Sequence, residues 1–295
     1  MDPTLRTRIT NDLKAILPEL TRGLRMIAKY IVDQPSDFGL DSIRETARKA
    51  GVSTYTLVRL AERMGFSSYD DLREPFRHAL VSASAQVEKP EWVDRLRDGG
   101  ALGQVQAEAS VNAMATVQRS LERQVPDQMH RVVTMLLGAR TVYLTAVRAS
   151  YAMAYYLHYV GRMALPNLQL IPRHMSSAID ELHTAGPGDV MIAITLTPFS
   201  RETIEACRFA QQRGVTLILI SDSEIISPVF SADETLIASS LSTHHMASYG
   251  GTLAVIEILL ALLVAEAGDP AKERIRSYEK LRRENQAYWA AKKKH

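Results

Sequence analysis

The chain has 295 residues, 46% of them hydrophobic and 23% charged, which is ordinary for a globular protein long enough for two domains. Its net charge of +2 excludes a generally polycationic protein, so any affinity for nucleic acid must come from local clusters of basic side chains. The single cysteine, Cys207, excludes an intrachain disulfide. It lies in an apolar helical pattern, which predicts a core residue and not a catalytic thiol.

The N-terminal residues 1–19 predict a helical arm with Leu5, Ile9 and Leu13 on one stripe, and they lack the apolar run of a signal peptide. A second helix is expected over 21–33, ending before Pro35 because the residue before proline disfavours helical backbone. The most apolar stretch, residues 253–265, is too short for a membrane span. We therefore expect a cytoplasmic protein.

Residues 41–66 predict two short helices joined by a tight turn. Ser42 and Glu45 have the spacing of a capping box at the start of the first helix. Gly51 ends that helix, where a left-handed backbone is least costly without a Cβ. Ser53 is expected to cap the second helix. A small alanine, a glycine four residues later and a Val-Ser start to the next helix are typical of a helix-turn-helix.

In the second helix, Leu57, Leu60, Ala61 and Met64 recur at helical spacing and are expected to face inward. The outer face would then enter a DNA major groove with its N-terminal side chains. The predicted DNA contacts are Ser53, Thr54, Tyr55, Thr56, Arg59 and Arg63. Supporting cations are Arg44, Arg48 and Lys49, together with Arg59 and Arg63. The alternative is a two-helix corner in any helical domain, with these charges on a solvated face.

The longer segment 20–72 resembles the N-terminal domain of the RpiR/MurR family of bacterial transcription regulators. The matching features are the opening helix TRGLRMIAKYIVDQP, the Ser42 helix, the GVS turn, and a recognition helix that ends in MGF and is followed by SSYDDLR. The resemblance implies a winged or extended helix-turn-helix domain that precedes a sugar-isomerase (SIS) domain.

The next part of the chain is more polar and predicts a linker over 82–100, in which Trp92 and Leu96 suggest a short helix. We thus expect an all-α DNA-binding domain over 1–81 and a second domain over 101–268. The second domain opens with helices over 102–121 and 126–137. In the first of these, the apolar positions are Val105, Ala109, Ala113 and Val117. A strongly charged final helix is expected over 269–295, capped by Asp269.

From Arg140 onward, short apolar runs alternate with helical stretches. The runs are TVYLTAV, LQLI, DVMIAIT, VTLILIS and ETLIAS. Nearly continuous apolar strands separated by helices are typical of a parallel sheet covered on both faces. The fold class predicted for this half is therefore α/β, a doubly wound sheet of five parallel strands.

Ligands of open parallel sheets bind beyond the carboxyl ends of the strands, and this rule selects polar residues after each predicted strand. The predicted effector-binding residues are Arg148, Ser150, Thr195, Thr197, Ser200, His174, His244 and His245. Ser150 and Ser200 stand at expected helix starts, where free N–H groups favour an anion. Alternatively these serines are only helix caps. The histidines lack the close spacing of a metal motif, so no metal is expected.

Residues 141–267 resemble an SIS domain, most strongly at GPGDVMIAIT and SRETIEACRFAQQRGVTLILISD. This resemblance implies a phosphosugar ligand, bound by Gly-x-Gly-x-Ser after the first strand and Ser-x-Ser-Gly-x-Thr after the third. Here the first motif reads Ala146-Val147-Arg148-Ala149-Ser150, and in the second the glycine is replaced by Pro198. Proline has no N–H to offer, whereas Arg148 adds a permanent cation. The ligand remains open between a phosphosugar and a carboxylate or other anion, and a purely structural domain is a further alternative.

Together these features predict a DNA-binding transcriptional regulator whose SIS-like domain binds a small anionic metabolite that changes operator affinity. A homodimer or dimer of dimers is expected, because pseudo-palindromic operators need two-fold symmetry. The helices flanking the linker and the final helix are the candidates for its contacts. No cofactor and no catalysis are expected. The alternative is an isomerase-like enzyme with an accessory helical domain, in which Glu202 or a histidine would be the base.

Overall fold

The computed structural model describes residues 5–84, 90–174, 176–224, 226–227, 229–244 and 246–289. The chain divides into two compact units, Met1–Asp98 and Gly99–His295. The first unit is helical within its described residues. Its helices are α1 (Leu5–Ile16), η1 (Leu17–Glu19), α2 (Arg22–Asp33), α3 (Pro35–Leu40), α4 (Ile43–Ala50), α5 (Thr54–Arg63), α6 (Tyr69–Ser84) and α7 (Glu91–Arg97).

The core of the first unit is formed by side chains that recur at helical spacing on α1, α2, α5 and α6. It includes Leu13, Ile27, Ile31, Leu57, Leu60 and Leu72, all 0% exposed. The short helix α3 was missed in the sequence. Helix α2 does end before Pro35, but the chain resumes helical backbone at once with Pro35 at the first position, where its missing N–H costs nothing. This turn buries Phe38 edge-on against Tyr69 and Phe76, at centroid distances of 5.6 and 5.0 Å.

The second unit combines a sheet with helices on both of its faces. Its strands are β1 (Val142–Thr145), β2 (Leu168–Ile171), β3 (Val190–Thr195), β4 (Thr216–Ser221) and β5 (Glu234–Ile237). Its helices are α8 (Gly100–Glu122), α9 (Pro126–Gly138), α10 (Ser150–Gly161), α11 (Ala178–Glu181), η2 (Leu182–Thr184), α12 (Arg201–Gln212), α13 (Gly250–Glu266) and α14 (Gly268–Glu284).

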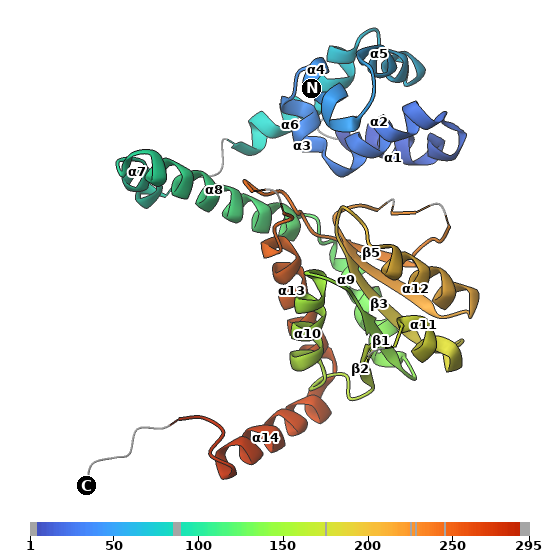
Figure 1. Cartoon of the computed structure of the whole chain (residues 1–295), viewed down its shortest axis with the longest axis vertical. Helices are drawn as coiled ribbons and strands as arrows, with labels where there is room; N and C mark the ends of the chain where they lie inside the picture. The colour runs from blue at the N-terminus through green and yellow to red at the C-terminus, as the bar shows by residue number, and fades with distance from the viewer. Residues whose placement is uncertain are drawn as a thin grey trace. The chain divides into compact units, whose positions relative to one another are not determined.

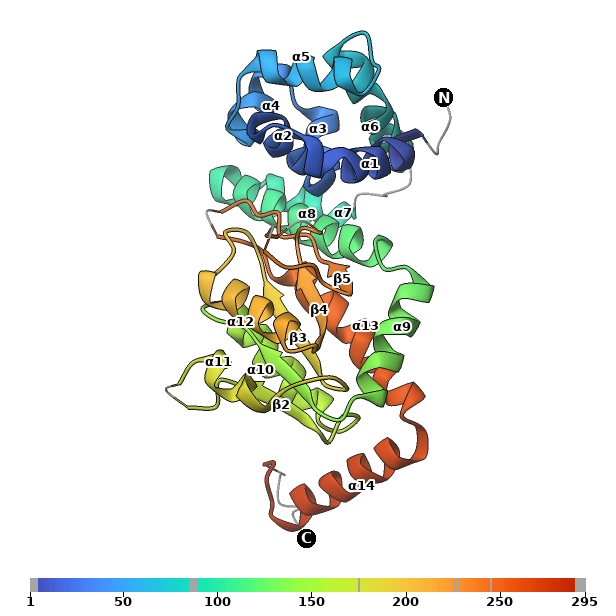
Figure 2. The ribbon, with the colours of Figure 1, turned by 90° about the vertical axis from the view of Figure 1, so that its right-hand side faces the viewer.

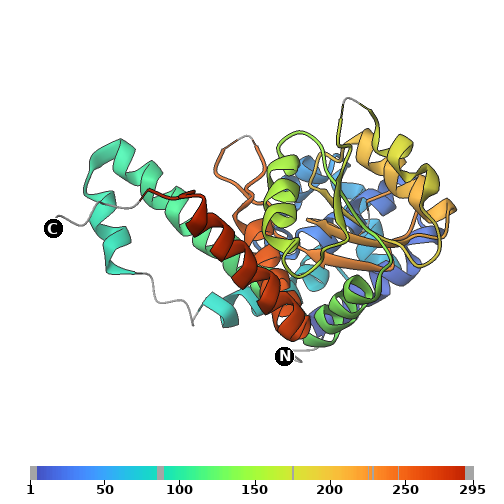
Figure 3. The same ribbon diagram turned by 90° about the horizontal axis from the view of Figure 1, so that it is seen from below.

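The five strands are parallel in the order β2-β1-β3-β4-β5, which confirms the doubly wound sheet predicted from the sequence. Alternate residues of each strand face opposite layers. Leu144, Ile192 and Ile218 pack with α9, α10 and α13 on one face. Met191 and Leu217 pack with η2 and α12 on the other face. Figures 1 and 3 show helices on both sides of the sheet. Cys207 lies in this second layer, as expected, and burial raises the pKa of its thiol to about 12.

Helix α8 packs closely on α13 through small residues. Its buried residues are Gly103, Ala107, Thr116 and Ser120. Of the four apolar positions expected from the sequence, Val105, Ala109 and Ala113 are exposed. Val117 is half-buried, and its Cγ2 would lie 3.7 Å from a Cβ on Gly250 of α13. A Cβ on Gly251 of α13 would lie 2.2 Å from Ser120 Oγ and 2.5 Å from the Ser239 carbonyl oxygen. Only glycine therefore fits at this crossing.

The last described helix, α14, leads away from the end of the sheet (Figure 2). It begins at Gly268, with Ala267 as the N-cap, and not with the Asp269 cap predicted from the sequence. Ala271 is its buried residue, and Arg274 fixes it by donating to the carbonyl oxygens of Met163 and Ala164 at 2.7 and 3.1 Å.

Among the described helices, no single one is long and apolar enough to cross a membrane. Helices α13 and α14, which are separated by a bend of 107°, reach the length and apolar composition of a membrane span only when they are taken together.

Candidate functional sites

The helix-turn-helix expected from the sequence is formed by α4, the Gly51 turn and α5. The Ser42 hydroxyl accepts a hydrogen bond from the Glu45 N–H at 3.3 Å and caps α4. Gly51 takes a left-handed backbone with φ of 67° and ends that helix. The Ser53 hydroxyl then accepts from the Thr56 N–H at 3.3 Å and caps α5. The two serine caps and the glycine turn are as predicted, but only half of the expected capping box forms, because the Glu45 carboxylate pairs with Arg48.

The outer face of α5 presents an aromatic ring and a cation. Tyr55 is 69% exposed, and the Arg59 guanidinium lies 6.0 Å from its ring centroid. Thr54 is also exposed. Neither Arg59 nor Arg44 pairs with an acid among the residues that the structure describes. Such a face suits contact with base edges and phosphates, because arginine donates to both.

The other predicted DNA contacts take part in the fold of the helix-turn-helix itself. The Ser53 and Thr56 hydroxyls lie 2.9 Å apart, and Thr56 Cγ2 would lie 3.5 Å from a Cβ on Gly23 of α2. Arg63 pairs loosely with Glu19 at 3.9 Å. All six residues remain predicted contacts. Among the described residues, the side chains of Thr54, Tyr55 and Arg59 have no hydrogen-bond or acidic partner within the domain.

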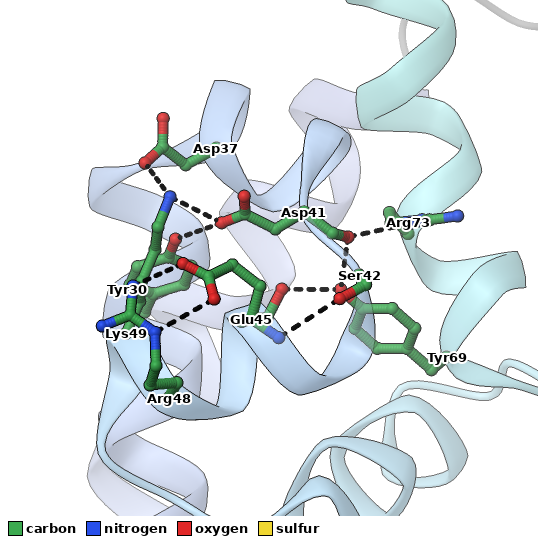
Figure 4. Close-up of polar contacts among 10 residues, drawn as sticks. Tyr30, Asp37, Asp41, Ser42, Glu45, Arg48, Lys49, Tyr69 and Arg73 are labelled. Carbon is green, nitrogen blue, oxygen red and sulfur yellow. Dashed lines mark hydrogen bonds and ion pairs between the residues drawn. The ribbon is translucent and has the colours of Figure 1, made fainter.

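Asp41, just before α4, is the centre of a hydrogen-bond network that holds four helices (Figure 4). Its carboxylate accepts from Lys49 Nζ at 2.9 Å and from the Tyr30 hydroxyl at 3.1 Å. Its carbonyl oxygen accepts from Arg73 Nη1 at 2.7 Å and from the Tyr69 hydroxyl at 3.3 Å. The network therefore links α2, α4 and α6 to Asp41, which is the C-cap residue of α3.

Ion pairs in and beside this network engage two of the basic side chains that were expected to support DNA binding. Lys49 also pairs with Asp37 at 2.9 Å, and Arg48 pairs with Glu45 through a bond of 3.0 Å from Nε. Burial, with the nearby Asp37 and Asp41 charges, raises the pKa of Tyr30, which stays a neutral donor. Of the cations expected to support DNA binding, Arg48 and Lys49 are thus held by acids within the domain.

A cavity of about 830 Å³ opens at the carboxyl edge of the sheet, beside the ends of β1, β2 and β3. This is the location expected for a ligand of an open parallel sheet. Its lining combines apolar and polar side chains from the three loops. They are Thr145, Val147, Arg148, Pro172, Ser176, Ser177, Ala178, Ile179, Pro198, Phe199, Ser200, Arg201, Glu202, Thr203 and Glu205.

Arg148 lies in this cavity on a strained backbone, with φ of 55°. A non-glycine residue in the left-handed region costs about 1–2 kcal/mol, and such strain concentrates at functional sites. The Arg148 guanidinium contacts the Glu202 carboxylate at 3.2 Å, and the Ser200 hydroxyl donates to the same carboxylate. The Ser200 bond, the backbone N–H of Glu202 and the Arg148 charge lower the pKa of Glu202. Glu202 is therefore an anion at neutral pH.

The loop after β3 has few free donors for a ligand. The Thr197 N–H lies 3.1 Å from each carboxylate oxygen of Asp222, and its hydroxyl lies 3.2 Å from one of them. Asp222 also accepts from the Ser240 hydroxyl at 2.6 Å. Pro198, which lines the cavity, has no N–H. The substitution noted in the sequence thus has a structural consequence, since this loop presents less backbone to an anion.

Of the predicted effector residues, the cavity includes Arg148 and Ser200. Ser150 is 7% exposed and lies 3.1 Å from the Tyr249 hydroxyl, and Thr195 is 3% exposed. The exposed His174 and His244 do not line the cavity, and His244 Nδ1 accepts from the Met246 N–H at 3.2 Å. His245 lies outside the described residues. The roles of the residues away from the cavity stay predictions.

Several residues that line the cavity were not predicted from the sequence, among them Ser176, Ser177, Phe199 and Thr203. Thr203 is 2% exposed, and its hydroxyl has no hydrogen-bond partner in the described part of the chain. The one available signal was Ser177 three residues before Asp180, a capping box that the structure contains. The described residues hold no group of three or more histidine, cysteine or acidic side chains arranged to bind a metal.

Comparison with known proteins assigns both units. Residues 7–82 match the helix-turn-helix domain of the rpiR family, and residues 135–265 match the SIS domain. The chain belongs to the RpiR family. This RpiR-family chain is therefore a helix-turn-helix transcriptional regulator with an SIS domain, as its sequence predicted.

This RpiR-family protein is similar to transcription regulators and to solved structures over much of its length. An uncharacterized HTH-type transcriptional regulator of Providencia stuartii is 23% identical over 219 residues, covering 72% of this chain and 74% of that protein. The sugar isomerase domain of the Sphaerobacter thermophilus RpiR transcription factor is 24% identical, with a TM-score of 0.56 over 60% of this chain and 99% of that one. Vibrio vulnificus NanR, solved with ManNAc-6P, is 20% identical, with a TM-score of 0.52 over 93% and 97% of the two chains. These solved structures support the fold.

Proposed function

We propose that this regulator binds an operator through α5 and a small anionic metabolite in the cavity beside Arg148, and that the metabolite changes operator affinity. The observation that carries the proposal is the conformation of Arg148. Its backbone is strained, and its guanidinium reaches the carboxylate at the start of α12 inside the cavity. A permanent cation at a helix N-terminus, at the carboxyl edge of a parallel sheet, favours an anionic ligand.

Two ligand classes fit this cation. A phosphosugar is supported by Vibrio vulnificus NanR, whose structure was solved with ManNAc-6P. A carboxylate is supported by the loop after β3, where Pro198 has no N–H and the Thr197 N–H is taken by Asp222. A thermal-shift screen of both classes separates them, because a ligand that binds only the folded chain raises its melting temperature.

We infer a homodimer, in which each copy supplies one α5 to a half-site. An exposed aromatic surface on α10 and α14 supports it. Tyr151, Tyr155 and Tyr159 follow one another along α10 with exposures of 41, 55 and 39%. The Arg282 guanidinium of α14 lies 4.1 Å from the Tyr278 ring centroid. Tyrosine and arginine are enriched at protein interfaces. A monomer in sedimentation equilibrium, with and without DNA, would contradict this part of the proposal.

The test is an operator titration with and without the ligand found in the screen. We expect Arg148→Ala to bind the operator as the wild type does and to lose the ligand response. Arg208→Ala is the matched control, because that arginine is 44% exposed on α12 and does not line the cavity. An Arg148→Ala variant that keeps the full response would refute the proposed site.

An isomerase is the alternative function for an SIS domain. It requires a general base, and Glu202 is the carboxylate available beside Arg148 in the cavity. The bonds that lower the pKa of Glu202 also weaken it as a base. We therefore expect no interconversion of phosphosugars by the purified chain, and turnover that Glu202→Gln abolishes would establish the alternative.

A further inference from the structure

The Glu202 carboxylate lies where donors for an anion converge. It accepts hydrogen bonds from the Ser200 hydroxyl and from Arg148 Nη2, and its own N–H belongs to the first turn of α12. The first N–H groups of a helix have no partner within the helix and attract negative charge. Ser200 is the N-cap of α12, but its hydroxyl makes no capping bond and serves the carboxylate instead.

We propose that Glu202 is an internal competitor for the effector, and that the anionic group of the effector displaces its carboxylate from Ser200 and Arg148. This inference rests on the proposed function, because it concerns the same cavity. The ligand chemistry it requires is a phosphate or carboxylate oxygen group. Displacement needs little rearrangement, since both side chains of the ion pair are largely open to solvent, Arg148 at 69% and Glu202 at 61% exposure.

An independent observation beside this ion pair indicates a ligand. Thr203, the next residue of α12, lines the cavity and is 2% exposed, with no partner for its hydroxyl among the described residues. A buried hydroxyl left without a partner loses the hydrogen bonds that it makes to water, so such groups are rare unless something else satisfies them. A ligand that replaces the Glu202 carboxylate would enter the cavity that Thr203 lines.

The competition also explains how the site selects for charge. A neutral ligand that displaced the Glu202 carboxylate would leave the Arg148 guanidinium with no anion to pair with. A ligand with an anionic group restores that pairing and frees Glu202 to turn toward solvent. Glu202 therefore sets a threshold of ligand affinity, and only anions that bind Arg148 and Ser200 better than a tethered carboxylate occupy the cavity.

The experiment is calorimetric titration of the full chain with inorganic phosphate. Glu202→Gln keeps the side-chain shape and removes the charge, and we expect its phosphate affinity to exceed that of the wild type by about tenfold or more. Glu205→Gln is the matched control. It removes a second negative charge from the lining of the same cavity, but Glu205 pairs with Arg208, at 2.7 Å, and not with Arg148. The double variant Arg148→Ala/Glu202→Gln should lose the gain.

Two results would overturn the inference. Equal phosphate affinity in the wild type and Glu202→Gln, including no measurable binding by either, shows that the carboxylate does not compete. An equal gain in phosphate affinity in Glu202→Gln and Glu205→Gln shows that removing either negative charge strengthens binding. Glu202 is then an ordinary acidic residue of the first turn of a helix. Neither result depends on DNA, so the proposed function is judged separately by the operator titration.

Discussion

The guanidinium of Arg59 lies 6.0 Å from the ring centroid of Tyr55, one turn earlier on the exposed face of α5. A cation above an aromatic ring is restrained without using its N–H donors. Arg59 therefore keeps its donors for a partner outside the chain, while Tyr55, 69% exposed, limits the orientations of the guanidinium. We predict that the two residues contact DNA together, and that substitutions of Tyr55 and of Arg59 have different effects on operator binding.

We expect Arg59→Ala to weaken operator binding by about 1–3 kcal/mol, the range for an arginine that contacts a base. Arg59→Lys should recover part of the affinity but less of the discrimination between sequences, because lysine lacks the bidentate fork. The measurement is fluorescence anisotropy with a duplex selected from a random pool by the wild-type chain. Unchanged affinity for Arg59→Ala would remove this residue from the interface.

The second prediction concerns Asp41, whose side chain is 14% exposed and accepts from Lys49 and Tyr30. Asp41→Asn removes the negative charge that pairs with Lys49. It also replaces one carboxylate oxygen by an amide nitrogen, so Lys49 and Tyr30 have one acceptor atom fewer. We expect a loss of about 1–3 kcal/mol in the stability of the helix-turn-helix unit, as for a buried hydrogen-bonded group left unsatisfied. Amide hydrogen exchange of α2 and α4 measures this loss.

The control for Asp41 is Asp94→Asn, because Asp94 is 66% exposed and pairs with Arg97, itself 38% exposed, on α7. Exposed ion pairs contribute about 0–1 kcal/mol, so exchange in α2 and α4 should change little. Equal effects of the two substitutions would show that Asp41 is not the centre of the network.

The helix-turn-helix and the sheet could be predicted from the sequence, whereas the contacts around Arg148 and Asp41 could not. The caps at Ser42 and Ser53 and the turn at Gly51 depend on residues three or four apart, so their spacing is visible in the chain. The five parallel strands could also be predicted, since each is an apolar run. Arg148 and Glu202 are 54 residues apart, and Asp41 meets Arg73 across 32, so no local pattern indicates either contact. The buried face of α8 was predicted wrongly at Val105, Ala109 and Ala113, because the close packing there buries glycine and small polar residues such as Thr116 and Ser120, which an apolar pattern does not indicate.

The third prediction concerns the crossing of α8 and α13. Gly251→Ala places a methyl group 2.2 Å from Ser120 Oγ and 2.5 Å from the Ser239 carbonyl oxygen. We expect destabilisation of about 1–3 kcal/mol, as for other overpacked sites. Adding Ser120→Ala removes the first clash but not the second, so the double variant should stay destabilised. Thermal unfolding followed by circular dichroism measures each variant.

Gly138→Ala is the control for this substitution, because a Cβ at Gly138 in α9 would meet nothing within 4 Å. Gly138 and Gly251 both lie in helices, so the change in helix propensity is comparable. A Gly251→Ala chain as stable as Gly138→Ala would show that α8 and α13 do not cross as closely as described.

Asp189 joins the amino ends of β1 and β3, at the edge of the sheet opposite the cavity. The carboxylate is 1% exposed and accepts from Arg140 Nε at 2.9 Å, from Arg140 Nη2 at 2.6 Å and from the Gly186 N–H at 3.0 Å. Burial alone would raise the pKa of Asp189, but the bonds from Arg140 and Gly186 outweigh it, so the pKa is lowered. The folded state therefore binds the proton of this carboxyl more weakly than the unfolded state does.

The fourth prediction is the pH dependence that follows from this lowered pKa. A carboxyl whose pKa falls on folding stabilises the protein fully above its unfolded value of about 4, and this contribution is lost as the pH falls through the folded value. We expect Asp189→Asn to cost about 1–3 kcal/mol between pH 5 and 8, and the difference from wild type to shrink below about pH 4. Urea unfolding at a series of pH values measures it. Asp269→Asn, at a carboxyl 96% exposed, should change stability by less than about 1 kcal/mol at every pH. A difference for Asp189→Asn that stays constant from pH 8 to pH 3 would contradict the assignment.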